Sequence, residues 1–385
     1  MDPVTITEDK LETGLRGVPV GFCPTSQVDP YKGLTYSGVG IGKLCKKDPL
    51  EVVYLLMTRK SPSEVELNEF KEDLSNRARK IPEGLDAFLK GLPKKGHPMK
   101  WFNAGLIFLG MNGEGDYRED FYNLTAWLPE LVAKIFVYRE GREANASDPS
   151  LGYIENFIHI MNVDADEKKL TELMRVFHVL HLDHGGGNLS TFVGKAIASG
   201  LEDFYGSIAG AMSALAGPRH GMANQECLSF IISIIDELGD KATDDTAMYE
   251  YLKKRYENKE LIYGFGHAVL RVEDLRATAL FELGEEICPD HEYFKVANVL
   301  RKVGSEFLKT KEKIADPYVN VDSASGSLLY ACGLEDPNYY TVLFGMSRCI
   351  GIGIQILYER LEARGGKGTP IIRPKYIYSG PAVQE

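Results

Sequence analysis

The histidine with the clearest setting for acid–base chemistry is His220, which lies in the run Gly-Pro-Arg-His-Gly at residues 217–221. The Gly-Pro pair breaks a helix and an apolar periodic stretch begins just afterwards, so His220 should lie near a helix N-terminus. The partial positive charge there favours neutral imidazole. A neutral imidazole can donate a hydrogen bond to an oxygen that gains charge. The alternative is a histidine that only helps to cap the helix.

A second histidine, His267, lies in the glycine-rich run Tyr-Gly-Phe-Gly-His-Ala-Val-Leu-Arg at residues 263–271. Gly264 and Gly266 permit unusual backbone angles and the close approach of a ligand. The run lacks the third glycine and the preceding strand of a dinucleotide fingerprint. Backbone N–H groups beside His267 and Arg271 would suit an anionic ligand. The alternative is a structural turn.

One carboxylate, Asp322, precedes an apolar stretch in Val-Asn-Val-Asp-Ser-Ala-Ser-Gly at residues 319–326. An Asp in that place is most often an N-cap. The functional alternative is a general base, since partial burial would raise the pKa of its carboxyl group.

Three single arginines, Arg276, Arg348 and Arg373, stand in apolar or small-residue contexts. Each alone is typical of a surface or ion-pairing residue, and they gain meaning only if the fold brings them near the histidines. The formal net charge is −11, which makes nucleic acid and anionic membranes poor partners. An anionic small molecule would require arginines gathered locally.

His178, His181 and His184 are spaced three residues apart, which could place metal ligands on one helix face. Three glycines, 185–187, follow directly and should end the helix near His184, so the common face is broken and we expect no metal. The run His-Gly-Gly-Gly is also typical of an esterase oxyanion loop, but the chain has no Gly-x-Ser-x-Gly elbow.

The elements that must position these residues are mainly helices, so we predict an all-α fold. Helix signals begin at Asp48-Pro49-Leu50-Glu51 and at Ser61-Pro62-Ser63-Glu64, the latter running to about Ala78. Residues 12–50 and 367–380 should be extended. Small residues dominate 206–217 and would let another helix approach closely, inside the subunit or at a subunit interface. The remaining predicted helices cover 82–91, 98–111, 119–142, 149–163, 167–181, 222–238, 245–257, 272–287, 293–308 and 341–363.

Length and composition set the broad class. The chain has 385 residues with 44% hydrophobic and 26% charged residues, which suits roughly two globular domains. Its six cysteines are widely spaced and should be free thiols. Residues 1–9 are acidic and have no apolar core or Arg-rich character, and no run approaches a membrane span, so we expect a cytoplasmic protein.

Taken together, the motifs closely resemble the citrate synthase family in its eukaryotic-like type I branch. The resemblance extends from about Val4 to Ser379, and the order and spacing of the segments fit. Two positions depart from the family pattern: Gly185 replaces an acidic residue and Ala324 replaces a histidine. The segments that carry the resemblance are His181–Asn188, Gly217–Glu226, Gly264–Arg271, Asn320–Gly326, Phe344–Arg348 and Arg373–Lys375.

The resemblance implies roles for the matching positions. Asp322 would remove a proton from the acetyl methyl group, His220 would stabilise the enol, and His267 would polarise the oxaloacetate carbonyl. Oxaloacetate would also be bound by His184, Arg276 and Arg348, and by Arg373 from the partner subunit of a homodimer. Coenzyme A, as acetyl-CoA or product, would be the second ligand, with no further cofactor. Its contacts would be Leu261, Tyr263, Gly264, Gly266, Arg271 and Lys313.

The resemblance also implies a large domain formed by 1–221 and 331–385 and a small domain formed by 222–330, with the site between them. The same residues would serve a 2-methylcitrate synthase that uses propionyl-CoA, because one methylene gives only ~1–3 kcal/mol of discrimination. A catalytically inactive relative that acts as a binding protein is the alternative from another class.

Overall fold

The computed structural model describes residues 6–380 and is mostly helical, with 59% of residues in helices and 3% in strands. The all-α prediction is confirmed. Short turns of 3₁₀-helix cover Glu8–Glu12, Gly239–Lys241 and Pro337–Tyr339, and a π-helical turn covers Tyr358–Glu362. The α-helices are α1 Ile41–Leu44, α2 Pro49–Thr58, α3 Glu64–Ala78, α4 Leu85–Lys90, α5 Met99–Gly110, α6 Tyr117–Glu140, α7 Tyr153–Met161, α8 Glu167–His181, α9 Leu189–Ser199, α10 Phe204–Leu215, α11 Ala223–Leu238, α12 Asp245–Glu257, α13 Leu275–Ile287, α14 Glu292–Lys309, α15 Asp322–Ala331 and α16 Tyr340–Leu357.

The N-terminal extended region contains a small antiparallel sheet in the order β1 (Ser26–Asp29), β2 (Gly33–Tyr36) and β3 (Val39–Gly40). Ser26 pairs with Tyr36 in the register of the first two strands. The Tyr36 side chain is fully buried, and its hydroxyl donates to the Val179 carbonyl near the end of α8. The sheet is thereby fixed beside the loop that follows α8.

The two helix N-termini that were predicted from the sequence are present, and one of them begins two residues later than expected. Asp48 accepts a hydrogen bond from the Leu50 N–H and Pro49 is the first helical residue of α2. The cap of α3 is Ser63, not Ser61, and it forms a reciprocal capping box with Glu66.

The central element is α16, which is buried almost along its whole length. The segment Pro337–Glu362 is long and apolar enough to cross a bilayer, but 94% of its apolar window is buried inside the fold. This segment is therefore a core helix, and the other elements pack around it.

The small-residue helix α10 packs closely on its neighbours within the subunit. A Cβ added at Gly210 would lie 2.1 Å from Cδ1 of Ile197 in α9, and one at Gly345 of α16 would lie 3.2 Å from Sδ of Met212 in α10. Small residues therefore bring the helix backbones together here, as the sequence predicted.

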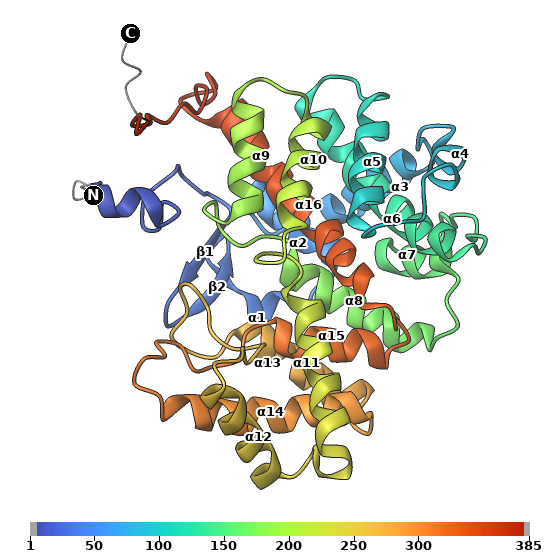
Figure 1. The fold of residues 1–385 in the computed structure, drawn as a ribbon. Coiled ribbons are helices and arrows are strands. Elements are labelled where there is room, and N and C mark those ends of the chain that lie inside the picture. Colours follow the sequence, from blue (N-terminus) through green and yellow to red (C-terminus); the bar gives the residue numbers. More distant parts are fainter. Residues whose placement is uncertain (1–5, 381–385) are drawn as a thin grey trace.

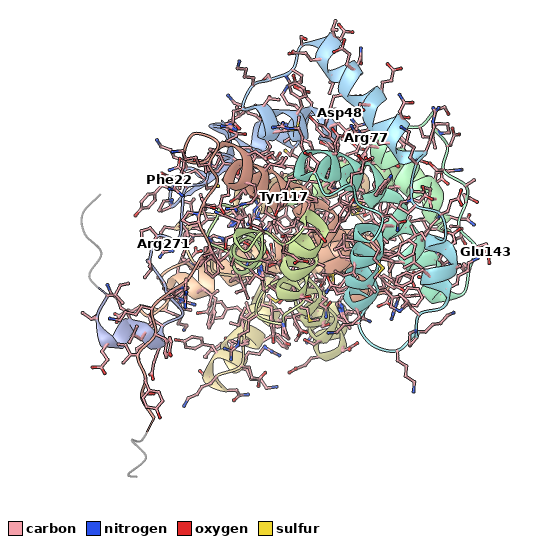
Figure 2. All side chains as sticks on the ribbon, turned by 90° about the horizontal axis from the view of Figure 1, so that it is seen from above. Phe22, Asp48, Arg77, Tyr117, Glu143 and Arg271 are labelled. Carbon is pink, nitrogen blue, oxygen red and sulfur yellow. The ribbon has the colours of Figure 1, made fainter. Side chains whose placement is uncertain are left out.

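Helices α11 to α15 form a group at the lower end of the view in Figure 1, below α8, α9, α10 and α16. The loops that carry the predicted chemistry lie where this group meets the rest of the molecule. Figure 2 shows side chains filling the interior and the labelled Phe22 at the edge of the molecule, 73% exposed.

Candidate active site

The His267 loop and the Asp322 segment are joined directly. Phe265 and Val319 form an antiparallel bridge, the Gly266 N–H donates to the Tyr318 carbonyl (3.0 Å), and the Asn320 N–H donates to the Gly264 carbonyl (2.9 Å). Gly264 has φ +84°, and a Cβ there would lie 3.0 Å from Sγ of Cys227. A side chain at this position would be both strained and crowded, so the glycine is what lets the two segments meet.

The ring of His267 is held in one tautomer. Its Nδ1 accepts hydrogen bonds from the N–H groups of Val269 and Leu270, each at 3.0 Å. Burial lowers the pKa of His267, and the charge of Arg276 lowers it further. The imidazole is therefore neutral with its hydrogen on Nε2, where it can be donated to a ligand.

His220 lies at a helix N-terminus, but the N-terminus that it contacts belongs to α9. Its Nε2 accepts from the Ser190 N–H (3.3 Å) and lies 2.9 Å from the Ser190 hydroxyl. Burial lowers the pKa of His220 to about 4. With Nε2 as an acceptor, the neutral ring carries its hydrogen on Nδ1 and can donate it.

Asp322 is the first residue of α15 and does not cap it. The side chain that accepts from the Asp322 N–H is that of Asn320, at 3.1 Å. Within residues 6–380 no hydrogen bond to the Asp322 carboxylate is formed, and burial raises its pKa to about 6 against the opposing charge of Arg276. A carboxylate that is ionised at neutral pH and has no hydrogen-bond partner is suited to act as a general base.

Arg276 is buried and is held by a carboxylate that the sequence analysis did not single out. Asp274 caps α13, and its carboxylate accepts from Arg276 Nη2 at 2.7 Å and from Arg276 Nε at 3.1 Å. The signal was present as an Asp two residues before the Arg at a helix start. The pair fixes the guanidinium through Nε and Nη2.

Arg348 is also buried, being 2% exposed. Its Nε donates to the His181 carbonyl at 3.0 Å, and its guanidinium lies 4.7 Å from the centre of the Phe344 ring. Burial lowers the pKa of Arg348 to about 10, while the negative charge of Asp183 opposes the shift.

His184 joins the same cluster, since its ring meets that of His267 edge to face at 5.2 Å between centroids. Its Nε2 is buried and has no hydrogen-bond partner in the described part of the chain. Burial, followed by the charges of Arg276 and Arg348, lowers the pKa of His184 well below its usual range. A buried ring nitrogen without a partner is costly unless a ligand supplies one.

The charges of Arg276 and Arg348 act on residues that were predicted from separate segments of the sequence, so these residues lie close together. The charge of Arg276 acts on His184, His267 and Asp322. The charge of Arg348 acts on His184 and His220. One region therefore combines two buried cations, neutral imidazole donors and a poised carboxylate, which can bind a small anion and move a proton next to it.

Arg373 does not join this cluster within one chain. Its side chain is exposed in the extended tail, and the neighbouring Ile372 N–H donates to the Ser199 hydroxyl at 2.9 Å. Ser199 ends α9, whereas Ser190 beside His220 lies in its first turn. Nine residues of helix separate the two by about 14 Å.

The positions expected to contact coenzyme A lie around the His267 loop or on the surface. Leu261 is 68% exposed, and Lys313 is exposed in the segment between α14 and α15. Arg271 Nη1 donates to the carbonyls of His267 and Val269, so it also clamps the loop.

The three spaced histidines have different surroundings. His178 Nδ1 bonds to the Ser347 hydroxyl at 3.0 Å, and His181 Nδ1 donates to the Phe177 carbonyl at 2.8 Å. Over residues 6–380, no group of three or more His, Cys, Asp or Glu side chains could hold a metal ion. The six cysteines are all free, four of them buried.

Comparison with known proteins shows the family of the chain. The sequence profile of the family described as citrate synthase, C-terminal domain, matches residues 14–375. The mitochondrial citrate synthase of Citrus maxima is 35% identical over 400 residues, which span 97% of this chain and 83% of the relative. The crystal structure of Thermotoga maritima citrate synthase has a TM-score of 0.82 at 29% identity and covers 97% of this chain and 96% of that chain.

A further solved structure supports the fold. The Thermoplasma acidophilum citrate synthase, solved as a ternary complex with carboxymethyl coenzyme A and oxaloacetate, has a TM-score of 0.83 at 24% identity, with 97% of each chain covered.

The predicted cytoplasmic address is wrong. The Citrus maxima relative and other curated relatives, such as that of Daucus carota, are named mitochondrial. The prediction depended on the acidic composition of residues 1–9 and on the lack of a membrane-spanning run, and the absence of such features could not carry it.

Proposed function

This chain belongs to the citrate synthase family, and on that premise we propose that it condenses acetyl-CoA with oxaloacetate and water to give citrate and CoA. The observation that carries the proposal is Asp322, a partly buried carboxylate whose pKa is raised to about 6. The charge of Arg276 acts on this carboxylate and also on two neutral imidazoles, those of His184 and His267.

Asp322 is the proposed base that takes a proton from the acetyl methyl group. Such a C–H group is far too weakly acidic for a carboxylate alone, so the thioester oxygen must be stabilised as charge develops on it. His220 would do this with its Nδ1 hydrogen. Because the pKa of His220 is lowered to about 4, it would donate the bond and remain neutral.

Oxaloacetate would lie between the two buried arginines. Arg276 and Arg348 offer planar guanidinium groups that suit carboxylates, and both are already fixed by protein contacts. His184 would supply a further contact through the ring nitrogen that lacks a partner. His267 would polarise the ketone with its Nε2 hydrogen and transfer that hydrogen to the alkoxide oxygen, which becomes the new hydroxyl group.

Coenzyme A would be bound by the loop before His267. Gly264 and Gly266 both have positive φ, at +84° and +81°, which supports close approach of the ligand to the backbone. We include Leu261, Tyr263, Arg271 and Lys313 among its proposed contacts. We propose no metal or prosthetic group for this reaction.

We propose that residues 222–330 form a small domain and that 1–221 and 331–385 form a large one. Helices α11 to α15 lie together in Figure 1 and support this division. Closure of one domain on the other would exclude water from the activated acetyl group and strengthen the contacts to the substrates.

We also propose a homodimer in which Arg373 reaches the oxaloacetate of the partner subunit. An apolar surface hollow lies between α5 and α10, where Ile107 is 43% and Met111 78% exposed. Small residues line its α10 side, including Gly206 and Ser213. The extended tail exposes Ile371 and Tyr376, and a second copy would cover such apolar groups.

The proposal is tested by release of free thiol from acetyl-CoA and from propionyl-CoA in the presence of oxaloacetate. We expect a clear preference for acetyl-CoA. Preference for propionyl-CoA would keep the mechanism and make the chain a 2-methylcitrate synthase. Release from neither would mean an inactive relative and would overturn the proposed function.

A further inference from the structure

Asp183 is a heavily hydrogen-bonded side chain near the site that none of the proposed roles uses. It is fully buried. Its carboxylate accepts from the Thr25 hydroxyl, the Ser26 hydroxyl (2.8 Å), the His184 N–H (2.8 Å) and Gln355 Nε2 (2.8 Å). These donors come from the N-terminal sheet region, from α16 and from its own loop, so three distant parts of the chain meet at one carboxylate.

The same side chains also fix the backbone after Asp183. The Ser26 hydroxyl accepts from the Gly185 N–H at 2.7 Å, and Gln355 Nε2 donates to the Gly185 carbonyl at 3.3 Å. Asn188 Nδ2 donates to the carbonyls of His184 and Gly185. The peptide groups on both sides of His184 are therefore held by side chains, although residues 182–188 lie between α8 and α9 without regular structure.

The Asp183 charge reaches the site as well. Arg348 is a buried cation that contacts the His181 carbonyl and the Phe344 ring, and the charge of Asp183 favours its protonated form. Asp183 therefore serves two groups at once: it orients the loop of His184 and it compensates the charge of Arg348.

We propose that Asp183, with Thr25, Ser26 and Gln355, is a positioning cluster that sets the orientation of His184 and so the affinity for oxaloacetate. The N-terminal strand β1 is then a working part of the substrate site, even though it contributes no group that touches substrate. The inference depends on the proposed function only in naming oxaloacetate as the ligand.

Removal of one donor tests the cluster while leaving the carboxylate in place. Thr25→Val keeps the side-chain shape but deletes the hydroxyl, so Asp183 loses one hydrogen bond and the loop gains freedom. Thr125→Val is the matched control, because Thr125 is equally buried and its hydroxyl donates to the Phe121 carbonyl within α6, away from the cluster. Thr25→Ser restores the hydroxyl and should restore function.

Oxaloacetate binding is measured by calorimetry, and the Michaelis constants and kcat by thiol release. For Thr25→Val we expect the dissociation constant of oxaloacetate to rise roughly tenfold. The KM for acetyl-CoA at saturating oxaloacetate should stay within about twofold, since the His267 loop is untouched. Thr125→Val should lower the melting temperature. It should leave the dissociation constant of oxaloacetate and the KM for acetyl-CoA unchanged.

A second readout requires no ligand. In protein labelled with ¹⁵N-histidine, the ring resonances of His184 should shift in Thr25→Val and not in Thr125→Val. The peaks that are absent from the spectrum of His184→Gln identify these resonances.

If Thr25→Val does not fold, Ser26→Ala takes its place, because it removes the hydrogen bonds to both Asp183 and the Gly185 N–H. Unmoved His184 resonances, or equal losses for oxaloacetate and acetyl-CoA, would overturn the proposal. If the wild type binds oxaloacetate but releases no thiol, the proposed function fails while the positioning test still stands.

Discussion

Replacement of Asp322 by Asn should stabilise the protein and abolish its turnover. Burial raises the pKa of Asp322 from 3.8 to about 6, so the folded chain disfavours the ionised form by about 3 kcal/mol at about 1.36 kcal/mol per pKa unit. Asn has nearly the same shape and carries no charge. Asp322→Asn should therefore raise the free energy of unfolding by up to about 3 kcal/mol at pH 8.

The stability difference between Asp322→Asn and the wild type should depend on pH, in the direction that the pKa shift sets. The pKa is higher in the folded than in the unfolded chain, so the penalty is absent below about pH 4, grows up to about pH 6 and is complete above it. The difference in melting temperature between variant and wild type should follow the same course and reach a few degrees. Turnover should fall by roughly 10²–10⁴-fold or more, because the base is lost.

The assay is differential scanning fluorimetry from pH 4 to pH 8, with thiol release measured in parallel. Asp240→Asn is the matched control, since Asp240 is an exposed carboxylate after α11, and it should change neither quantity. Equal melting temperatures of Asp322→Asn and wild type at pH 8 would refute the burial argument. Near-normal turnover in the variant would refute the assignment of the base.

Three further predictions concern the ionised groups of the site. In the wild type, log(kcat/KM) for acetyl-CoA should fall with unit slope below about pH 6, as the Asp322 carboxylate takes up its proton; a flat profile down to pH 5 would argue against that base. Arg276→Gln should leave Asp274 buried and unpaired, so unfolding measured in urea should show a loss of ~3–5 kcal/mol together with loss of oxaloacetate binding in calorimetry. Arg373→Ala should weaken oxaloacetate binding without lowering stability, and dimers mixed from Arg373→Ala and His267→Ala subunits should recover activity; no recovery would place Arg373 outside a shared site.

The helices could be predicted from the sequence wherever an amphipathic face or a cap was clear. The predicted helix over 167–181 matches α8, and 245–257 matches α12. Helix α9 was missed, although Leu189, Phe192, Val193 and Ile197 recur at helical spacing after three glycines. Its buried face consists of small and polar residues instead. A further signal was Asn188, which caps α9 by accepting from the Thr191 N–H.

The missed helix affected the reasoning about His220. The sequence placed this histidine at the start of the helix that follows it, whereas the N–H group that fixes its tautomer is that of Ser190 in α9. The local expectation of a neutral ring still agrees with the lowered pKa, because burial acts in the same direction. What the sequence could not supply was which distant helix end would contact the ring.

The same limit applies to two carboxylates near the site, Asp322 and Asp183. The local sequence left Asp322 as either an N-cap or a general base. In the structure Asp322 is the first residue of α15, Val321 stands at the N-cap, and the Asn320 side chain accepts from the Asp322 N–H. Asp183 was visible only as the residue before His184. Its importance comes from Thr25 and Gln355, which are 158 and 172 residues away in sequence, and such contacts are fixed by tertiary packing.

The balance of charges around the site bears on the proposed contribution of Arg373. The guanidinium groups of Arg271, Arg276 and Arg348 act there together with the carboxylates of Asp274, Asp322 and Asp183. Burial keeps the imidazoles neutral, so they donate hydrogen bonds but add no positive charge. A dicarboxylate entering this region would leave an excess of negative charge in a poorly solvated place, which is costly. The Arg373 side chain is exposed in an extended tail, so in the proposed homodimer the Arg373 of a second copy would supply positive charge that such a ligand requires.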